Sequence, residues 1–139
     1  MARLFTEESP SGWTALFLNQ RSGTAVTFSC YIKVATGAEG GTTVNVATSA
    51  TEQVAAQLYR ITGWFGALSG VVTSTSATGT SVSPNPPSLT PSWGTANTLW
   101  LATHAYDHDA TRTTTAYPAN YTNGLHTQSN TGASAVHVA

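Results

Sequence analysis

Hydrophobic and polar residues alternate with a period of two along several stretches of this chain. The clearest stretch is residues 25–34, in which one face would be made by Val26, Phe28, Cys30 and Ile32. Such alternation is typical of a half-buried β-strand. An apolar run at residues 13–18 precedes it, and turn-forming residues fill positions 19–23. The pattern therefore predicts an antiparallel hairpin whose loop runs from Asn19 to Gly23.

The same signal predicts further strands, separated by turn residues. Residues 98–106 carry apolar bulk on both faces, which indicates a central core strand. Residues 52–61 mix helix-favouring and strand-favouring types, and their β-rich surroundings favour a strand. The other predicted strands are residues 42–48, 71–75, 113–117 and 133–139. Roughly seven to nine short strands predict an all-β fold, a jelly-roll-like antiparallel β-sandwich forming a single domain over residues 1–139.

Two stretches are expected outside the main sheets. Residues 1–10 are predicted to form an extended N-terminal arm, in which Glu7 and Glu8 stand where a Sec signal peptide needs an apolar core. No run of 18 or more apolar residues predicts a membrane span. The prolines within residues 83–87 cannot donate ladder hydrogen bonds, so that stretch is expected at an edge or as a crossing connection.

Charge is scarce in this sequence and restricts the classes of partner. Only 8% of the 139 residues are charged and the net charge is -1, against about 25% charged residues in typical soluble domains. The five basic residues are dispersed, which excludes a nucleic-acid footprint. Low net charge weakens the repulsion between copies, so self-association is expected. Cys30 is the only cysteine, which excludes an intrachain disulfide.

One group of side chains has metal-binding chemistry, namely His104, Asp107, His108 and Asp109. Imidazole and carboxylate ligands suit divalent metals, but this spacing matches no zinc signature. A polar turn over residues 107–112 that solvates a strand end is the favoured interpretation. We therefore assign no metal ligand and no cofactor, and keep a metal-dependent enzyme as the third hypothesis.

The sequence also gives little support for other catalysis. It contains no Gly-x-Ser-x-Gly element, and the few carboxylates do not provide an acid and base pair. We expect a protein that is not an enzyme.

Aromatic residues offer a different function. Six could stack on sugar rings, although core packing explains most of them: Trp13, Trp64, Trp93, Trp100, Tyr117 and Tyr121. Tyr117 and Tyr121 flank a turn-rich stretch that includes Asn120, so these three are the expected ligand or interface contacts. They support a carbohydrate-binding module, with a glycan as ligand, as the alternative function.

Several stretches together form a recognisable series, namely residues 12–14, 35–39, 55–63, 83–94, 98–102 and 117–124. The series resembles small β-sandwich structural proteins of tailed bacteriophages, similar to capsid decoration (cement) or tail-associated modules. The resemblance implies a virion location, with the major capsid protein and further copies of this chain, as in a trimer, as partners. No nucleic acid or membrane partner is implied.

Members of that group carry a strand before the Gly12-Trp13-Thr14 element and more β-structure after the last stretch of the series. This chain has neither in full. Because unpaired strand edges have to be covered, we expect neighbouring subunits to complete the sheet.

Overall fold

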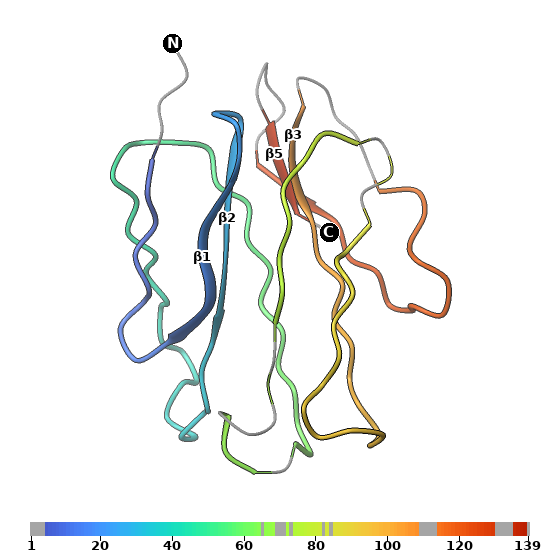
Figure 1. Ribbon diagram of the computed structural model, residues 1–139. Coiled ribbons are helices and arrows are strands. Elements are labelled where there is room, and N and C mark those ends of the chain that lie inside the picture. The colour runs from blue at the N-terminus through green and yellow to red at the C-terminus, as the bar shows by residue number, and fades with distance from the viewer. Residues whose placement is uncertain are drawn as a thin grey trace.

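The computed structural model describes residues 5–64, 66–68, 72, 74–81, 83, 85–108 and 114–129, and the backbone of 135–138 (Figure 1). The described strands are β1 (Thr14–Ser22), β2 (Val26–Ile32), β3 (Ala105–His108), β4 (Thr127–Gln128) and β5 (Ala135–Val138). β1 pairs with β2, and a second sheet has the order β3-β5-β4, with every pair antiparallel. The described fold is all-β, as predicted. In the described residues no helix is long and apolar enough to cross a membrane.

The predicted hairpin is confirmed as the β1-β2 pair, but its loop is shorter than expected. Asn19 and Gln20 lie inside β1, and the turn is closed by the Ala25 N–H donating to the Ser22 carbonyl at 3.3 Å. Asn19 has a φ of 53° and sits in a register shift between Phe17 and Gln20. Asparagine tolerates this left-handed conformation, which is common at β-bulges as well as in turns. The turn-like residue at position 19 therefore marks a bulge within the strand.

The best-packed part of the molecule lies on this hairpin. The rings of Phe17 and Phe28 lie with their centroids 5.3 Å apart and are tilted by 59°. Val26, on the same predicted face of β2 as Phe28, is buried. Aromatic pairs in this geometry stabilise a strand pair beyond the area they bury. The hairpin is thus the centre of the apolar packing.

The N-terminal stretch is extended, and from Thr6 onward it lies against the rest of the chain. The Glu8 N–H donates to the Ala47 carbonyl and the Ser49 N–H donates to the Thr6 carbonyl, both at 3.0 Å. Glu7 and Thr48 form an isolated antiparallel bridge. This bridge is the ladder pairing observed for residues 42–48, so the prediction of a full strand there is wrong.

The predicted core strand at residues 98–106 is also wrong over most of its length. Only Ala105 and Tyr106 belong to a strand, and Leu99 and Leu101 are 63% and 56% exposed. Apolar bulk on both faces indicates a central strand only where neighbours cover both faces. No described segment pairs with residues 98–104 through a ladder.

The remaining predictions have mixed outcomes. Residues 52–61 and 114–117 form no strand, and neither do residues 72, 74 and 75 of the predicted strand 71–75. Residues 71, 73 and 113 lie outside the described residues, and the described residues of 83–87 form no strand. The final strand is confirmed as β5, which is the central strand of its sheet. β4 was not predicted, and the described residues hold five strands rather than seven to nine. Whether a predicted stretch forms a strand depends on a pairing partner that can lie far along the chain, and a local pattern does not show that partner.

Candidate binding surfaces

Most large hydrophobic side chains in the described part of the chain are exposed to solvent. Fifteen of them qualify as exposed, whereas Val26 is the one described hydrophobic core residue that is buried. The accessible surface is 10009 Å², compared with roughly 6,800 Å² for a compact monomer of this mass. Large hydrophobic side chains that are exposed in such number are typical of protein regions that other proteins cover.

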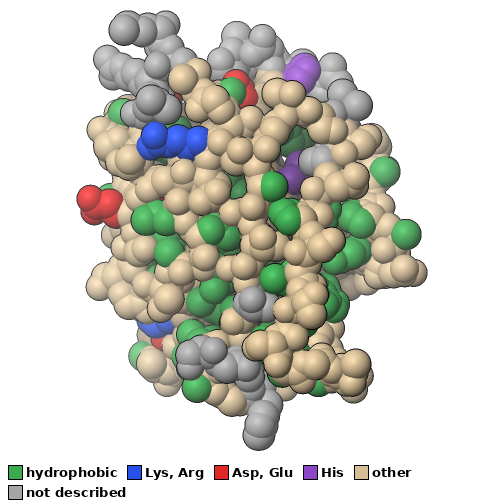
Figure 2. All heavy atoms as spheres, in the orientation of Figure 1, with side chains coloured by type: hydrophobic (Ala, Val, Ile, Leu, Met, Phe, Trp, Pro, Cys, Tyr) green, Lys and Arg blue, Asp and Glu red, His purple; other side chains and the backbone are tan. Residues whose placement is uncertain are grey.

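Charged groups interrupt this surface at few points. Figure 2 shows hydrophobic side chains scattered over the whole of one face, with the few visible charged side chains toward its left and upper margins. A surface without ions can be buried without the cost of desolvating charge. The face is therefore suited to contact with another protein.

The predicted contact residues Tyr117, Asn120 and Tyr121 lie together on an exposed turn. The Tyr121 N–H donates to the Pro118 carbonyl at 3.1 Å, which closes the turn. Asn120 has a φ of 70°, a conformation that asparagine tolerates in turns. Both tyrosines are exposed, at 41% for Tyr117 and 36% for Tyr121. The turn presents two aromatic rings and one amide to solvent.

Gly124 allows the Tyr117 ring to lie directly against the backbone of this loop. A Cβ atom at position 124 would overlap the atoms of the ring. The ring thus has backbone on one side while much of its surface stays open. Such a supported aromatic ring offers one flat apolar face to a ligand.

The histidine and aspartate group does not converge on one point. Asp107 and His108 belong to β3 rather than to a polar turn, and successive strand residues face opposite sides. Asp107 is exposed, while His104 and His108 are half-buried. Asp109 lies outside the described residues. Within the described side chains, no group of three His, Cys, Asp or Glu residues is arranged to hold a metal ion.

His104 instead belongs to a stack of three rings that sequence reasoning missed. The Tyr106 ring lies 5.6 Å from the His104 ring and 6.4 Å from the His126 ring, centroid to centroid. The Tyr106 hydroxyl and His126 Nε2 are 3.3 Å apart. Partial burial, and then the charge of His126, lowers the pKa of His104. His126 lies twenty residues after Tyr106 in the sequence and directly precedes the two-residue strand β4, so no local pattern indicates this contact.

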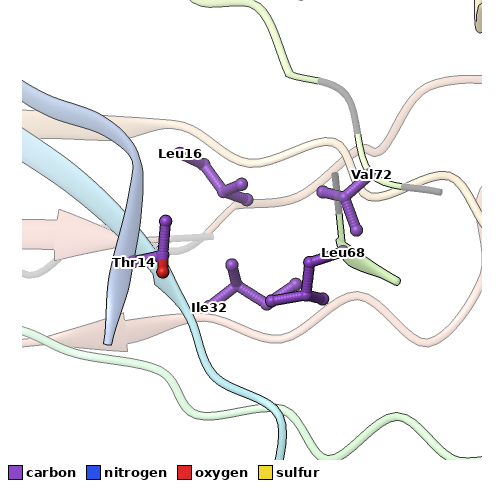
Figure 3. A pocket seen from close by; sticks show the side chains of 5 residues that line it. All are labelled: Thr14, Leu16, Ile32, Leu68 and Val72. Atoms are coloured by element: carbon purple, nitrogen blue, oxygen red, sulfur yellow. The ribbon is translucent and has the colours of Figure 1, made fainter. Parts of the chain in front are cut away.

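An apolar hollow of about 360 Å³ lies beside the hairpin. Its lining residues point toward one another in Figure 3, namely Thr14, Leu16, Ile32, Leu68 and Val72. Thr14 supplies the one hydroxyl among them. Ligand sites hold a few convergent polar groups that fix orientation, and this hollow lacks such a set. We assign no ligand to it.

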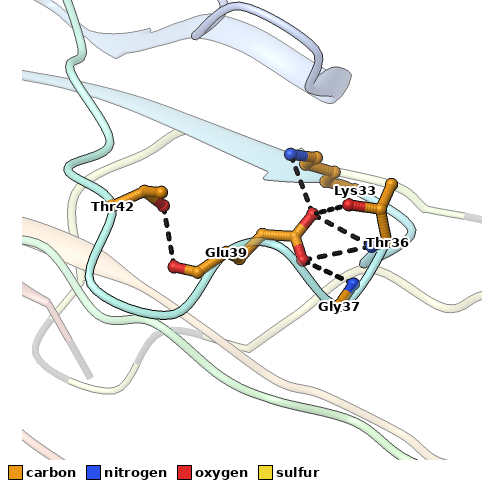
Figure 4. Close-up of polar contacts among 5 residues, drawn as sticks. All are labelled: Lys33, Thr36, Gly37, Glu39 and Thr42. Atoms are coloured by element: carbon orange, nitrogen blue, oxygen red, sulfur yellow. Dashed lines mark hydrogen bonds and ion pairs between the residues drawn. The ribbon is translucent and has the colours of Figure 1, made fainter.

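Glu39 holds together the loop that follows β2 (Figure 4). Its carboxylate accepts hydrogen bonds from the Thr36 N–H at 2.9 and 3.1 Å and from the Gly37 N–H at 2.9 Å. The Thr36 hydroxyl and the Lys33 ammonium, at 2.9 and 3.1 Å, complete the set. The Thr36 backbone bond is the largest of the causes that lower the pKa of Glu39 to about 2. This carboxylate shapes its own loop and is not free to act as an acid or base.

No family model, curated protein or solved structure matches this chain.

Proposed function

We propose that this chain is a structural protein of a bacteriophage virion, a decoration or cement protein that binds and reinforces the outer capsid surface. The observation that carries the proposal is the distribution of apolar side chains, which are exposed in large number on a chain with few charges. Burial of apolar area between subunits, at roughly 25 cal/mol per Å², would provide the adhesion. The proposal needs neither a cofactor nor a catalytic residue.

The same proposal includes a more specific fold than the two described sheets. The two sheets would be parts of a jelly-roll-like β-sandwich in which residues 52–60 and 98–104 run as further extended segments. In the virion, neighbouring copies and the major capsid protein would cover the apolar side chains of these segments. Such cover removes the exposed edges and apolar rows that otherwise favour aggregation.

The reinforcing role predicts a property of particles that lack this chain. Particles assembled after deletion of its gene should be complete but should release their DNA at a lower temperature than wild-type particles, because junctions between capsid proteins lose a covering subunit. DNA release is followed with an intercalating dye during heating. Adding the purified chain back should restore the wild-type release temperature. Deleted particles that are as heat-resistant as wild type would contradict the cement role.

A carbohydrate-binding module on a tail or fibre is the second candidate, supported by the exposed tyrosine turn. If the turn binds glycans, Gly124→Ala should lower glycan affinity about tenfold or more, because the new methyl group displaces the Tyr117 ring. Binding to a glycan array and then titration calorimetry would measure this. Gly79→Ala is the matched control, since a Cβ atom at position 79 meets nothing within 4 Å. Equal binding by both variants, or none by wild type, would reject this candidate.

A further inference from the structure

Within residues 52–60, Val54, Ala56 and Leu58 form an apolar row that is exposed to solvent, while Gln53 and Gln57 form a polar row that bonds to other parts of the chain. Exposure alternates along the middle of the segment: Val54 and Leu58 are 53% and 76% exposed, whereas Ala55 and Gln57 are half-buried. The Gln57 amide Nε2 donates to the hydroxyl of Thr127, the first residue of β4, at 3.3 Å. Residues 52–60 form no strand, but exposure alternates along residues 54–58 as it would in one, and an alternating surface segment of a monomer usually has the reverse arrangement, with apolar residues inward.

The polar row ties this segment to a second point of its own chain. The Ser129 hydroxyl donates to Gln53 Oε1 at 2.7 Å, so two side-chain contacts hold the segment beside the end of β4. In Figure 1 the segment is the green trace that descends through the middle of the view. Gln53 and Gln57 therefore make the contacts with the chain, and the apolar row of Val54, Ala56 and Leu58 stays exposed and open to a partner.

The exposed row has opposite charges at its two ends. Reading alternate residues, it consists of Glu52, Val54, Ala56, Leu58 and Arg60, all of them exposed. The ion pair found in the described part of the chain joins Lys33 to Glu39, so Glu52 and Arg60 do not pair with each other or with another described residue. The row is thus an apolar centre between one negative and one positive end.

We propose that a second copy of this chain packs against this row in antiparallel orientation, about a twofold axis at Ala56. In that orientation Glu52 of each copy meets Arg60 of the other, and Val54 meets Leu58. A parallel orientation would place like charges opposite each other, which is unfavourable. A contact made twice by the same surface is the usual form of a symmetric dimer.

Affinity and orientation come from different parts of the row. The apolar side chains of Val54, Ala56 and Leu58 supply the area that the contact would bury, since all three are exposed in the single chain. Exposed ion pairs add little affinity but select orientation. The inference deepens the self-association in the proposed function by naming its surface.

Charge reversal tests the antiparallel register directly. Glu52→Arg alone and Arg60→Glu alone each create two like-charge contacts across the axis, so each should weaken dimerisation about tenfold or more in low salt. The double variant Glu52→Arg with Arg60→Glu restores both contacts and should recover wild-type dimerisation. Sedimentation equilibrium at micromolar concentrations measures all three. Glu8→Arg, a reversal at another exposed carboxylate, should leave dimerisation unchanged.

A second variant tests the apolar centre without depending on charge. Leu58→Ser should weaken the dimer in both low and high salt, and it should leave the fold intact because the side chain is exposed. Wild-type chain that is monomeric at these concentrations would overturn the inference, as would a double variant no better than the singles. A monomeric chain still found on capsids would leave the decoration role standing and reject this dimer alone.

Discussion

Replacing Phe28 with alanine is expected to lower the free energy of unfolding by about 3 kcal/mol. The Phe28 ring packs on Phe17 across the hairpin, on the face that also holds buried Val26. Few other described side chains have comparable packing, so the surrounding structure has little with which to fill the space. Urea unfolding, followed by tryptophan fluorescence, measures the change.

Two further variants show whether packing is the cause. Phe28→Leu keeps most of the apolar volume and should cost about 1 kcal/mol. Leu18→Ala removes an apolar side chain from the same hairpin at a position that is 39% exposed, and it should change stability by less than about 0.5 kcal/mol. If Phe28→Ala were as mild as Leu18→Ala, the hairpin would not be the centre of the packing.

The second large effect is expected at Asn19, which joins the N-terminal arm to β1. Its side-chain oxygen accepts from the Glu7 N–H at 2.7 Å, and its amide donates to the Glu7 carbonyl at 3.2 Å. Asn19→Ala removes both bonds. It also places alanine, which has no side-chain hydrogen bond to compensate, in the left-handed conformation at a φ of 53°. The expected loss is about 2 to 3 kcal/mol, from roughly 1 kcal/mol per hydrogen bond and about 1 kcal/mol for the backbone.

Asn19→Gly separates these two contributions. Glycine adopts the left-handed conformation at no steric cost but makes no side-chain bond, so this variant should be about 1 kcal/mol more stable than Asn19→Ala. Hydrogen exchange at the Glu7 amide should accelerate in both variants, because both lose the acceptor. Slow exchange at Glu7 in Asn19→Ala would show that the Asn19 amide does not hold the arm.

The pattern of hydrophobic and polar residues predicted those parts of the fold in which the paired segments are close in sequence. The alternation of Val26 and Phe28 with hydroxyl residues was sufficient to place β2, because the strand pairs with its neighbour in sequence. Asn19 shows the limit of such reasoning, since asparagine in a left-handed conformation is found in turns and bulges alike. Only the register with β2 distinguishes the two.

Long-range pairing was not predictable in the same way. β5 lies between β3 and β4, and β4 has only two residues, too few for a periodic signal. The contact between Tyr106 and His126 depends on that sheet, so neither residue stood out. The apolar residues Leu99 and Leu101 indicated a core strand because sequence alone does not show whether other segments of the chain cover both faces.

The candidate binding residues could also be predicted only in part from the sequence. Turn residues around Tyr117 and Tyr121 indicated an exposed loop, and both rings are exposed. The support that Gly124 gives to Tyr117 depends on how the loop folds back, which spacing does not reveal. Asp107 was expected to begin a polar turn, but it belongs to β3, where successive side chains face opposite sides of the sheet.

The most direct test of the decoration role is to count this chain in purified virus particles from its source by quantitative peptide mass spectrometry, with the major capsid protein as the internal reference. We predict one copy per capsid subunit or a simple fraction of that number, because a protein that reinforces capsid junctions has to occupy them throughout the shell. A handful of copies per particle would instead place it on the tail or fibre, and its absence from particles would contradict the virion proposal.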